Sequence, residues 1–379
     1  MPEVTKEMVV EALSKVNDPE LHRDLVSLGM IRNVAVSDGA VKFTLALTTM
    51  ACPLKSRMQE DCKTAVMRIP GVREVTIDVT ADTPRNARPA SGKKVGDIVL
   101  QDMLPTVKNA IAVASGKGGV GKSTVSVNIA AALAMEGARV GLLDADIYGP
   151  SIPIMMGVTE QPEITDSEEI IPIRKYGIEL MSIGFVIPEE QSVIWRGPMV
   201  AKMLQQFLSG VKWGELDYLI VDLPPGTGDA QLTLTQSVPL AGGLIVSTPQ
   251  AVALADVRRG ITMFKKVDVP ILGVVENMST FVCPKCGHEE HIFAYGGARS
   301  EAEKLGVPFL GEIPIDLSIR EGGDSGVPVV VAHPDSPVGL AFRKLARDAA
   351  AAVSVSNLTA RKAERHEPAR TGKELPMMK

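Results

Sequence analysis

The sequence contains little that would mark a membrane, exported or nucleic-acid-binding protein. No uninterrupted apolar stretch reaches the roughly 20 residues that a membrane-spanning helix needs. Residues Met1 to Asp18 do not form a charged and then apolar leader. Acidic residues outnumber basic ones, 45 against 40, for a formal net charge of −5. We therefore expect residence in the cytoplasm, no nucleic-acid partner and no stable membrane association.

Cysteine is also scarce, since the 379 residues contain only four, at positions 52, 62, 283 and 286. Nothing marks the chain as exported, so structural disulfides are not expected. Cys283 and Cys286 form a Cys-x-x-Cys pair, whereas the other two lie far upstream. Two thiolates at this spacing can bind one metal ion or one edge of a cluster. Tetrahedral zinc or a four-iron cluster normally takes four protein ligands.

Three interpretations of the Cys283–Cys286 pair remain open. A two-fold axis could bring two such pairs together on one bridging iron–sulfur cluster, the interpretation that we favour. His288 and His291 of the same loop could instead complete a Cys2His2 zinc site within one chain. The third interpretation is a disulfide or an unreactive pair.

The most informative motif is a glycine-rich segment that reads Gly116-Lys117-Gly118-Gly119-Val120-Gly121-Lys122-Ser123-Thr124. It matches the phosphate-binding pattern Gly-x-x-x-x-Gly-Lys-Ser and lies between an apolar run, 110–115, and a helical pattern, 123–135. Backbone N–H groups of such a turn face phosphates, and the helix N-terminus adds positive charge. The whole segment is therefore a candidate ATP site, in which Lys122 reaches the β and γ phosphates and Ser123 binds Mg²⁺.

Lys117 is a second lysine in a loop that Lys122 already serves. A further ammonium group beside Lys122 would be costly to bury without additional negative charge. The alternative is a solvated loop charge, because lysine is ordinarily a surface residue.

Carboxylates follow two further apolar runs. Residues 140–143 precede Asp144 and Asp146, and residues 219–221 precede Asp222. At the carboxyl ends of parallel strands these side chains would face the phosphates. Asp222 suits a residue that holds Mg²⁺ through water, and the N–H of Gly226 could meet a γ-phosphate. Each aspartate could instead be a turn or cap residue.

The alternation of predicted elements indicates two domains. Strands near 110, 140, 178, 218, 243 and 271 alternate with helices near 123, 198, 229, 250 and 298, which predicts an α/β domain with a mostly parallel sheet over 106–355. Residues 84–105 have linker composition. Residues 1–83 predict a small α+β domain with the order helix, two strands, helix, strand. The polar residues 356–379 predict a disordered tail.

The glycine-rich segment resembles the deviant Walker A branch of P-loop NTPases, which includes nitrogenase iron protein and the septum-positioning and partition ATPases. The resemblance implies an ATP-linked homodimer in which Lys117 crosses to the partner subunit's nucleotide. It also implies that Asp146 orients the attacking water, that Asp144 lies nearer the metal, and that Asn277, after a strand at 271–275, contacts adenine. A turn residue is the alternative for Asn277.

Further segments of the sequence closely resemble the Mrp/ApbC group of iron–sulfur cluster carrier ATPases. They are Asp144 to Ser151, Trp195 to Met199, Leu223 to Asp229, Cys283 to His288 and Gly311 to Asp316. The first domain resembles the MIP18-type module through Asp18-Pro19-Glu20, Leu25 to Met30 and Thr48 to Pro53. Cys52, at a predicted helix start, is either a reactive thiol or a buried apolar residue, and Cys62 is predicted to be core.

These resemblances imply a slow ATPase that carries an iron–sulfur cluster, expected to be 4Fe-4S and bridging two subunits, and transfers it to apo-proteins together with assembly factors. The catalytic residues would be Lys117, Lys122, Asp146 and Asp222. An alternative is a spatial-organising ATPase related to MinD and ParA with a structural zinc pair. A nucleotide-dependent adaptor that uses the first domain for docking is a third possibility.

Overall fold

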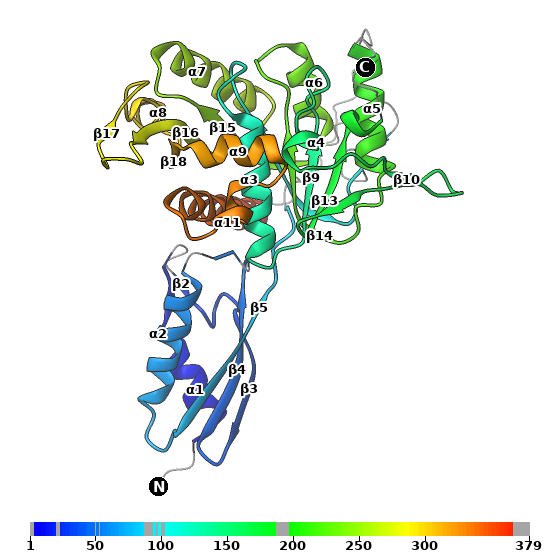
Figure 1. The fold of residues 1–379 in the computed structure, drawn as a ribbon. Helices are drawn as coiled ribbons and strands as arrows, with labels where there is room; N and C mark the ends of the chain where they lie inside the picture. The colour runs from blue at the N-terminus through cyan, green and yellow to red at the C-terminus, as the bar shows by residue number, and fades with distance from the viewer. Residues whose placement is uncertain are drawn as a thin grey trace, which may run out of the picture.

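The computed structural model describes residues 4–19, 23–49, 51–52, 54–86, 94–95, 98–99, 103–186 and 197–366. They form two domains, each with its own cluster of buried apolar side chains (Figure 1). Among these residues, no helix is long and apolar enough to cross a membrane.

The first domain is a three-stranded sheet with two helices. Its elements are α1 (Lys6–Leu13), β1 (Asn17–Asp18), β2 (Arg23–Asp24), β3 (Ile31–Ser37), β4 (Ala40–Leu47), α2 (Lys55–Met67) and β5 (Glu74–Ala81). Strand β4 pairs with β3 antiparallel and with β5 parallel. Alternate residues of β4, such as Phe43 and Leu45, are buried with Leu13 of α1 and Met58 of α2. The α+β order predicted for this domain is confirmed, with the β1–β2 hairpin in addition.

The second domain is built on a nine-stranded sheet. Its neighbouring strands follow the order β12 (Ile173–Lys175), β13 (Ile178–Ser182), β9 (Val140–Asp144), β14 (Leu216–Asp222), β8 (Val107–Ala114), β15 (Leu240–Ser247), β16 (Ile271–Val282) and β17 (Glu289–Glu290). Strand β18 (Phe309–Ile315) also pairs with β16. All pairings are parallel except those of β12 and β17 at the edges. Apolar runs without alternation form these strands because helices cover the sheet.

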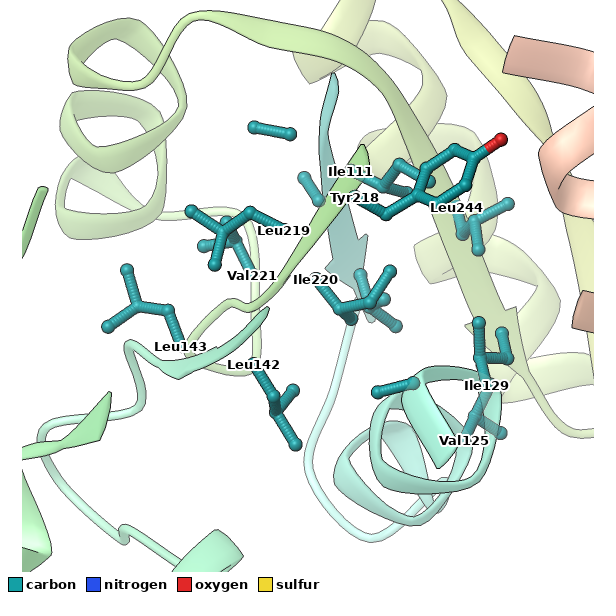
Figure 2. Close-up of a cluster of buried hydrophobic side chains, with 14 of the residues drawn as sticks. Ile111, Val125, Ile129, Leu142, Leu143, Tyr218, Leu219, Ile220, Val221 and Leu244 are labelled. Atoms are coloured by element: carbon teal, nitrogen blue, oxygen red, sulfur yellow. The ribbon is translucent and has the colours of Figure 1, made fainter. Parts of the chain in front are cut away.

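Helices connect the strands. They are α3 (Lys122–Met135), α4 (Ile152–Met155), α5 (Gly197–Ser209), α6 (Asp229–Ser237), α7 (Ala251–Lys266), α8 (Gly297–Leu305), α9 (Leu317–Ser325), α10 (Val329–Ala332) and α11 (Pro337–His366). Helix α3 is buried on almost every side because it packs between the sheet and α11. Its Val125 and Ile129 lie in the core with Ile111 of β8 and Ile220 of β14 (Figure 2). The α/β fold with a mostly parallel sheet is confirmed.

Smaller elements complete the structure. They are β6 (Lys94–Val95), β7 (Ile98–Val99), β10 (Glu163–Ile164), β11 (Ile170–Ile171) and a 3-10 helix, Ile183–Phe185. The β6–β7 pair lies in the predicted linker, so that segment is not wholly without regular structure. The start of the linker also touches the second domain, because the Pro84 carbonyl accepts hydrogen bonds from Asn109 (3.0 Å) and Asn357 (3.3 Å).

Two boundaries predicted from the sequence are wrong. Helix α11 continues to His366, so a disordered tail does not begin at residue 356. Packing explains the extension, since Asn357 is 1% exposed and bonds Asn109 at 2.8 Å. Strand β16 continues to Val282 rather than ending at residue 275. Trp195, Arg196 and residues 367–379 lie outside the described residues.

Close packing in the sheet leads to a stability prediction. An added Cβ at Gly243 of β15 would lie 2.5 Å from the Phe264 ring of α7. Gly243→Ala should therefore lower the free energy of unfolding by about 1–3 kcal/mol. Gly323→Ala is the control, because the nearest heavy atom there is 3.8 Å away. Because Gly323 lies in α9, alanine at this position should raise the free energy of unfolding by about 0.5–1 kcal/mol. Urea unfolding tests both, and an undiminished stability of Gly243→Ala would contradict this packing.

Candidate nucleotide and cysteine sites

The phosphate-binding loop connects β8 to α3 at the carboxyl edge of the sheet. Gly119 (φ 78°) and Gly121 (φ 80°) have left-handed backbone conformations, which glycine adopts without a steric penalty. No heavy atom lies within 4 Å of a Cβ built on Gly118 or Gly119, so this part of the loop borders open space. The loop is thus accessible to a ligand and adjoins the N-terminus of α3.

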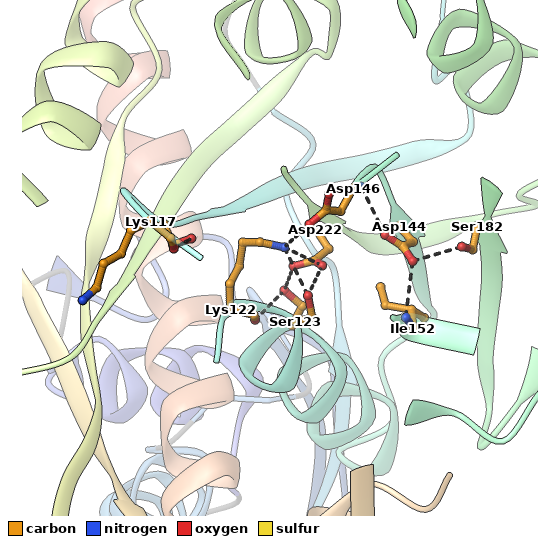
Figure 3. Close-up of polar contacts among 10 residues, drawn as sticks. Lys117, Lys122, Ser123, Asp144, Asp146, Ile152, Ser182 and Asp222 are labelled. Carbon is orange, nitrogen blue, oxygen red and sulfur yellow. Dashed lines mark hydrogen bonds and ion pairs between the residues drawn. The ribbon is translucent and has the colours of Figure 1, made fainter. Parts of the chain in front are cut away.

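Asp222 organises the centre of this site (Figure 3). Its carboxylate is fully buried at the end of β14. It accepts hydrogen bonds from Lys122 Nζ (2.7 Å), Ser123 Oγ (2.6 Å) and Ser126 Oγ (2.6 Å). These three hydrogen bonds, one of them from the positively charged ammonium group, compensate for burial of the carboxylate. Ser126 was missed from the sequence, although it lies one helical turn after Lys122 on the same side of α3.

Two further carboxylates lie beside this cluster. Asp144 accepts hydrogen bonds from the backbone N–H groups of Asp146 (3.1 Å) and Ile152 (3.3 Å), and from Ser182 Oγ (3.0 Å). Burial, and then the charge of Asp222, raise the pKa of Asp144 to about 7. Burial also raises the pKa of Asp146.

Asp146 has a carboxylate oxygen available to a ligand. Its Oδ2 is 3.9 Å from Lys122 Nζ, while its Oδ1 is buried with no hydrogen-bond partner in the described part of the chain. The hydroxyl of Ser123 and the carboxylates of Asp222 and Asp146 are oxygen donors of the kind that Mg²⁺ prefers. The residues present therefore fit a nucleotide with magnesium.

Lys117 points away from this cluster (Figure 3). Within the described ranges it makes no ion pair. Gly226, which follows β14, has φ 102° and donates its N–H to the Ser115 carbonyl at 2.9 Å. The structure therefore brings Lys122, Ser123, Asp144, Asp146 and Asp222 together, places Gly226 beside the loop, and leaves Lys117 directed elsewhere.

Asn277 lies inside β16 and holds the phosphate-binding loop. Its Nδ2 donates to the Val120 carbonyl at 2.8 Å, and its side chain is 5% exposed. A Cβ on Gly121 would lie 2.1 Å from the same nitrogen. The turn-residue alternative is therefore wrong, and the adenine contact stays a prediction.

The cysteine pair lies in the turn between β16 and β17. Cys283 N–H donates to the His288 carbonyl and Gly287 N–H to the Cys283 carbonyl, both at 2.9 Å. Hydrogen bonds from the backbone of Lys285 and Cys286, and from the Cys286 side chain, lower the pKa of the Cys283 thiol. Cys283 is half-buried and Cys286 exposed, and neither forms a disulfide. A lowered pKa favours the thiolate, which is the metal-binding form.

The histidines of this turn do not complete a metal site. His288 Nε2 lies 3.5 Å from Glu290, and His291 stacks on Tyr295 with ring centroids 4.6 Å apart. Over the residues that the structure describes, no group of three or more His, Cys, Asp or Glu side chains could hold a metal ion. The structure therefore does not join His288 and His291 to the cysteines as a single-chain Cys2His2 site. The site bridging two subunits stays a prediction.

The cysteines of the first domain have different surroundings. Cys62 is fully buried in the core, as predicted, and burial raises its pKa to about 12. Cys52 is half-buried just before α2, next to Ala51, which is buried against the second domain. A role for Cys52 in metal chemistry stays a prediction.

The sheet order, the loop and the acidic cluster define the class of protein as a P-loop NTPase. Residues 106–350 match the family described as NUBPL iron-transfer P-loop NTPase, and residues 6–79 match the iron–sulfur cluster assembly protein family. The chain belongs to this iron-transfer P-loop NTPase family and carries the assembly domain at its N-terminal side.

Similar proteins support this assignment. A Synechocystis protein named "Iron-sulfur cluster carrier protein" is 50% identical over 94% of this chain and 99% of its own length. The Escherichia coli K12 protein of the same name is 43% identical over 92% and 93%. A solved nucleotide-binding protein from Archaeoglobus fulgidus, in complex with ADP, is 42% identical with a TM-score of 0.55, over 62% of this chain and 92% of that one.

The raised pKa of Asp144 leads to a pH prediction. Its contribution to stability is present below the ordinary carboxyl pKa of 3.8 and is lost as pH rises through about 7. Asp144→Asn cannot ionise. From pH 5 to 7 the variant should therefore gain stability relative to the wild type by up to about 1.4 kcal/mol per pH unit. Urea unfolding in chelator, without nucleotide, measures this gain. A difference independent of pH would contradict the raised pKa.

Proposed function

We propose that the protein is an ATP-dependent iron–sulfur cluster carrier that binds its cluster between two subunits and transfers it to apo-proteins. The observation that carries the proposal is the cysteine pair. Cys286 is exposed, the Cys283 thiol has a lowered pKa, and the pair lies at the end of a strand that also contacts the phosphate-binding loop. The names of the relatives in Synechocystis and Escherichia coli support a carrier role.

ATP with Mg²⁺ would bind the loop from Gly116 to Thr124. Backbone N–H groups of Gly118, Gly119 and Gly121 would face the phosphates, and the complex of the Archaeoglobus fulgidus protein with ADP supports nucleotide binding there. Bound magnesium supplies a positive charge that stabilises the developing charge of phosphoryl transfer. Ser123 would hold the ion directly and Asp222 through water, whereas Asn277 would contact adenine.

Hydrolysis would depend on residues that already surround the open edge of the loop. Lys122 would exchange its contact with Asp222 for the phosphates. Asp146 would orient a water molecule through its unpartnered Oδ1, with Asp144 holding the Asp146 backbone in place. Gly226 would donate its N–H to a γ-phosphate instead of the Ser115 carbonyl. These steps need only local rearrangement. Slow turnover, regulated by assembly of the dimer, stays part of the proposal.

A homodimer would complete both sites. Lys117 points away from the acidic cluster of its own chain, as expected for a lysine that reaches the partner's nucleotide. Two Cys283–Cys286 pairs would supply four thiolates, the usual number for a 4Fe-4S cluster. The cluster would be the cargo of this protein. Because Cys286 is exposed, the bound cluster would be accessible to recipient proteins. Apo iron–sulfur proteins and assembly factors would be the partners, and cytoplasmic residence stays part of the proposal.

The cysteine assignment predicts the outcome of a cluster count. Cys283→Ser and Cys286→Ser should each lose most of the iron and sulfide that the wild type binds after anaerobic reconstitution, because each substitution removes two of the four thiolates of the dimer. His288→Ala and His291→Ala are matched controls in the same turn and should retain the cluster. Undiminished iron and sulfide in both cysteine variants would end the proposal. Bound zinc that is lost in the histidine variants as well as in the cysteine variants would instead support the Cys2His2 site.

The assignment of Lys117 to the partner's nucleotide predicts that its removal lowers ATP hydrolysis while each subunit still binds nucleotide. Lys117→Ala should lower ATP turnover by roughly a hundredfold or more, because a charge that stabilises the transition state is removed. It should also abolish ATP-dependent dimerisation in light scattering, while each subunit still binds nucleotide. Lys304→Ala on the exposed face of α8 is the control. Normal turnover and dimerisation of Lys117→Ala would show that this lysine is only a solvated charge.

A further inference from the structure

Strand β16 joins the two candidate sites directly. It contacts the phosphate-binding loop through Asn277 and ends at Val282, immediately before Cys283. Cys283 is six positions after Asn277, a separation of at most about 20 Å of extended chain. No flexible connector intervenes, so a displacement of the strand at one end has a short route to the other end (Figure 1).

The contact with the loop is tight. Asn277 Nδ2 donates to the Val120 carbonyl at 2.8 Å, and the absence of a side chain on Gly121 makes room for this nitrogen. Closure of the loop on a phosphate would move the Val120 carbonyl. The buried amide of Asn277 would then either lose this hydrogen bond or follow the carbonyl and displace β16.

Glu276, the residue before Asn277, binds the chain where the segment that contains both cysteines ends. Glu276 is fully buried, and its carboxylate accepts hydrogen bonds from the backbone N–H groups of Gly296 (2.9 Å) and Ala298 (2.7 Å). These groups belong to the start of α8, where helix N–H groups have no partner within the helix. Residues 283–295, which include both cysteines, run from the end of β16 to this anchor. Glu276 therefore fixes the position of the chain at the end of this segment, next to β16.

Successive side chains of a strand project to opposite faces. Accordingly, Glu276 reaches α8 while Asn277 reaches the loop of α3. These two neighbouring residues thus connect the phosphate-binding loop on one side of β16 with the start of α8, where residues 283–295 end, on the other side. Movement of this dipeptide would shift both the start and the end of the segment that carries Cys283 and Cys286.

The backbone next to this dipeptide is irregular. Met278 has φ 56°, a left-handed conformation that side chains other than glycine rarely adopt. The pairing of β16 with β18 shifts register between Asn277 and Phe281, which is the signature of a bulge. Ser279 Oγ donates to the Ile313 carbonyl at 3.1 Å and holds the bulge against β18. The strain is therefore located between the loop contact and the cysteines.

We propose that Glu276, Asn277 and Met278 form the connection through which nucleotide bound at the phosphate-binding loop repositions Cys283 and Cys286. This inference rests on the proposed function and specifies how nucleotide would regulate the cysteine site. Glu276 and Met278 are positioning residues in it, since they would act through the backbone of β16 and the start of α8. Asn277 transmits the movement of the loop.

The test measures the alkylation rate of Cys283 and Cys286 in the full-length, cluster-free protein under anaerobic conditions. Iodoacetamide is the probe, mass spectrometry reads each cysteine, and the rate is compared with and without a non-hydrolysable ATP analogue plus Mg²⁺. In the wild type the nucleotide should change the rate by about fivefold or more, the usual lower range of coupling between two sites. Cys52 serves as an internal reference.

Glu276→Gln removes one of the two acceptors at the start of α8, and Met278→Gly removes the side chain that opposes the left-handed backbone. Each should bring the nucleotide-dependent ratio close to one while a fluorescent ATP analogue still binds with wild-type affinity. Glu303→Gln, the same change at an exposed position of α8, should keep the wild-type ratio. The two variants act on different interactions, so misfolding of one leaves the other as the test.

The outcomes separate this inference from the function on which it rests. A nucleotide-dependent change of about fivefold or more in the wild type that both variants retain would overturn the connection through Glu276, Asn277 and Met278, and nothing else. A wild-type ratio of one would overturn nucleotide control of the cysteines altogether. Absence of a cluster after reconstitution would overturn the carrier function, whatever the ratios.

Discussion

The buried carboxylate of Asp222 is the constraint from which the nucleotide site follows. A charge without access to water is stable only when its hydrogen bonds are complete, and here Lys122, Ser123 and Ser126 all donate to it. These three side chains come from the first turns of α3, whereas Asp222 ends β14. Their meeting fixes the position of the helix against the sheet, and with it the curvature of the glycine loop that lies between β8 and α3.

The same cluster makes the site electrostatically unbalanced. Asp144 and Asp146 lie close to Asp222, and Lys122 is the lysine that pairs with this group. Burial first, and then the charge of Asp222, raise the pKa of Asp144, and Oδ1 of Asp146 has no hydrogen-bond partner among the described residues. Such a site gains from a bound cation, which is what a magnesium nucleotide brings. Lys117 does not relieve the imbalance within its own chain, and this is the physical basis for assigning it to a partner.

The cysteine turn shows the opposite design. Cys286 is exposed and Cys283 half-buried. Hydrogen bonds from the backbone of Lys285 and Cys286 lower the pKa of the Cys283 thiol, and the nearby histidines contact Glu290 and Tyr295. Two ligands without a third form a weak metal site in one chain and a strong one when two chains meet. A cluster bound between two subunits, as proposed, could be released when the chains separate, whereas a closed single-chain site would retain it.

Local properties of the chain were enough to predict the loop, the strand and helix order, and the cysteine pair, because glycine conformations, apolar runs and ligand spacing do not depend on distant contacts. The sequence identified Asp222 and Lys122 as separate candidates, and the parallel sheet order β9–β14–β8 confirmed them as neighbours although 100 positions separate them. Only the tertiary structure revealed the role of Ser126, the contact of Asn277 with the loop, and the extension of α11 beyond residue 356. Each of these depends on packing between distant segments, and in α11 burial of Asn357 outweighs the polar composition that predicted disorder.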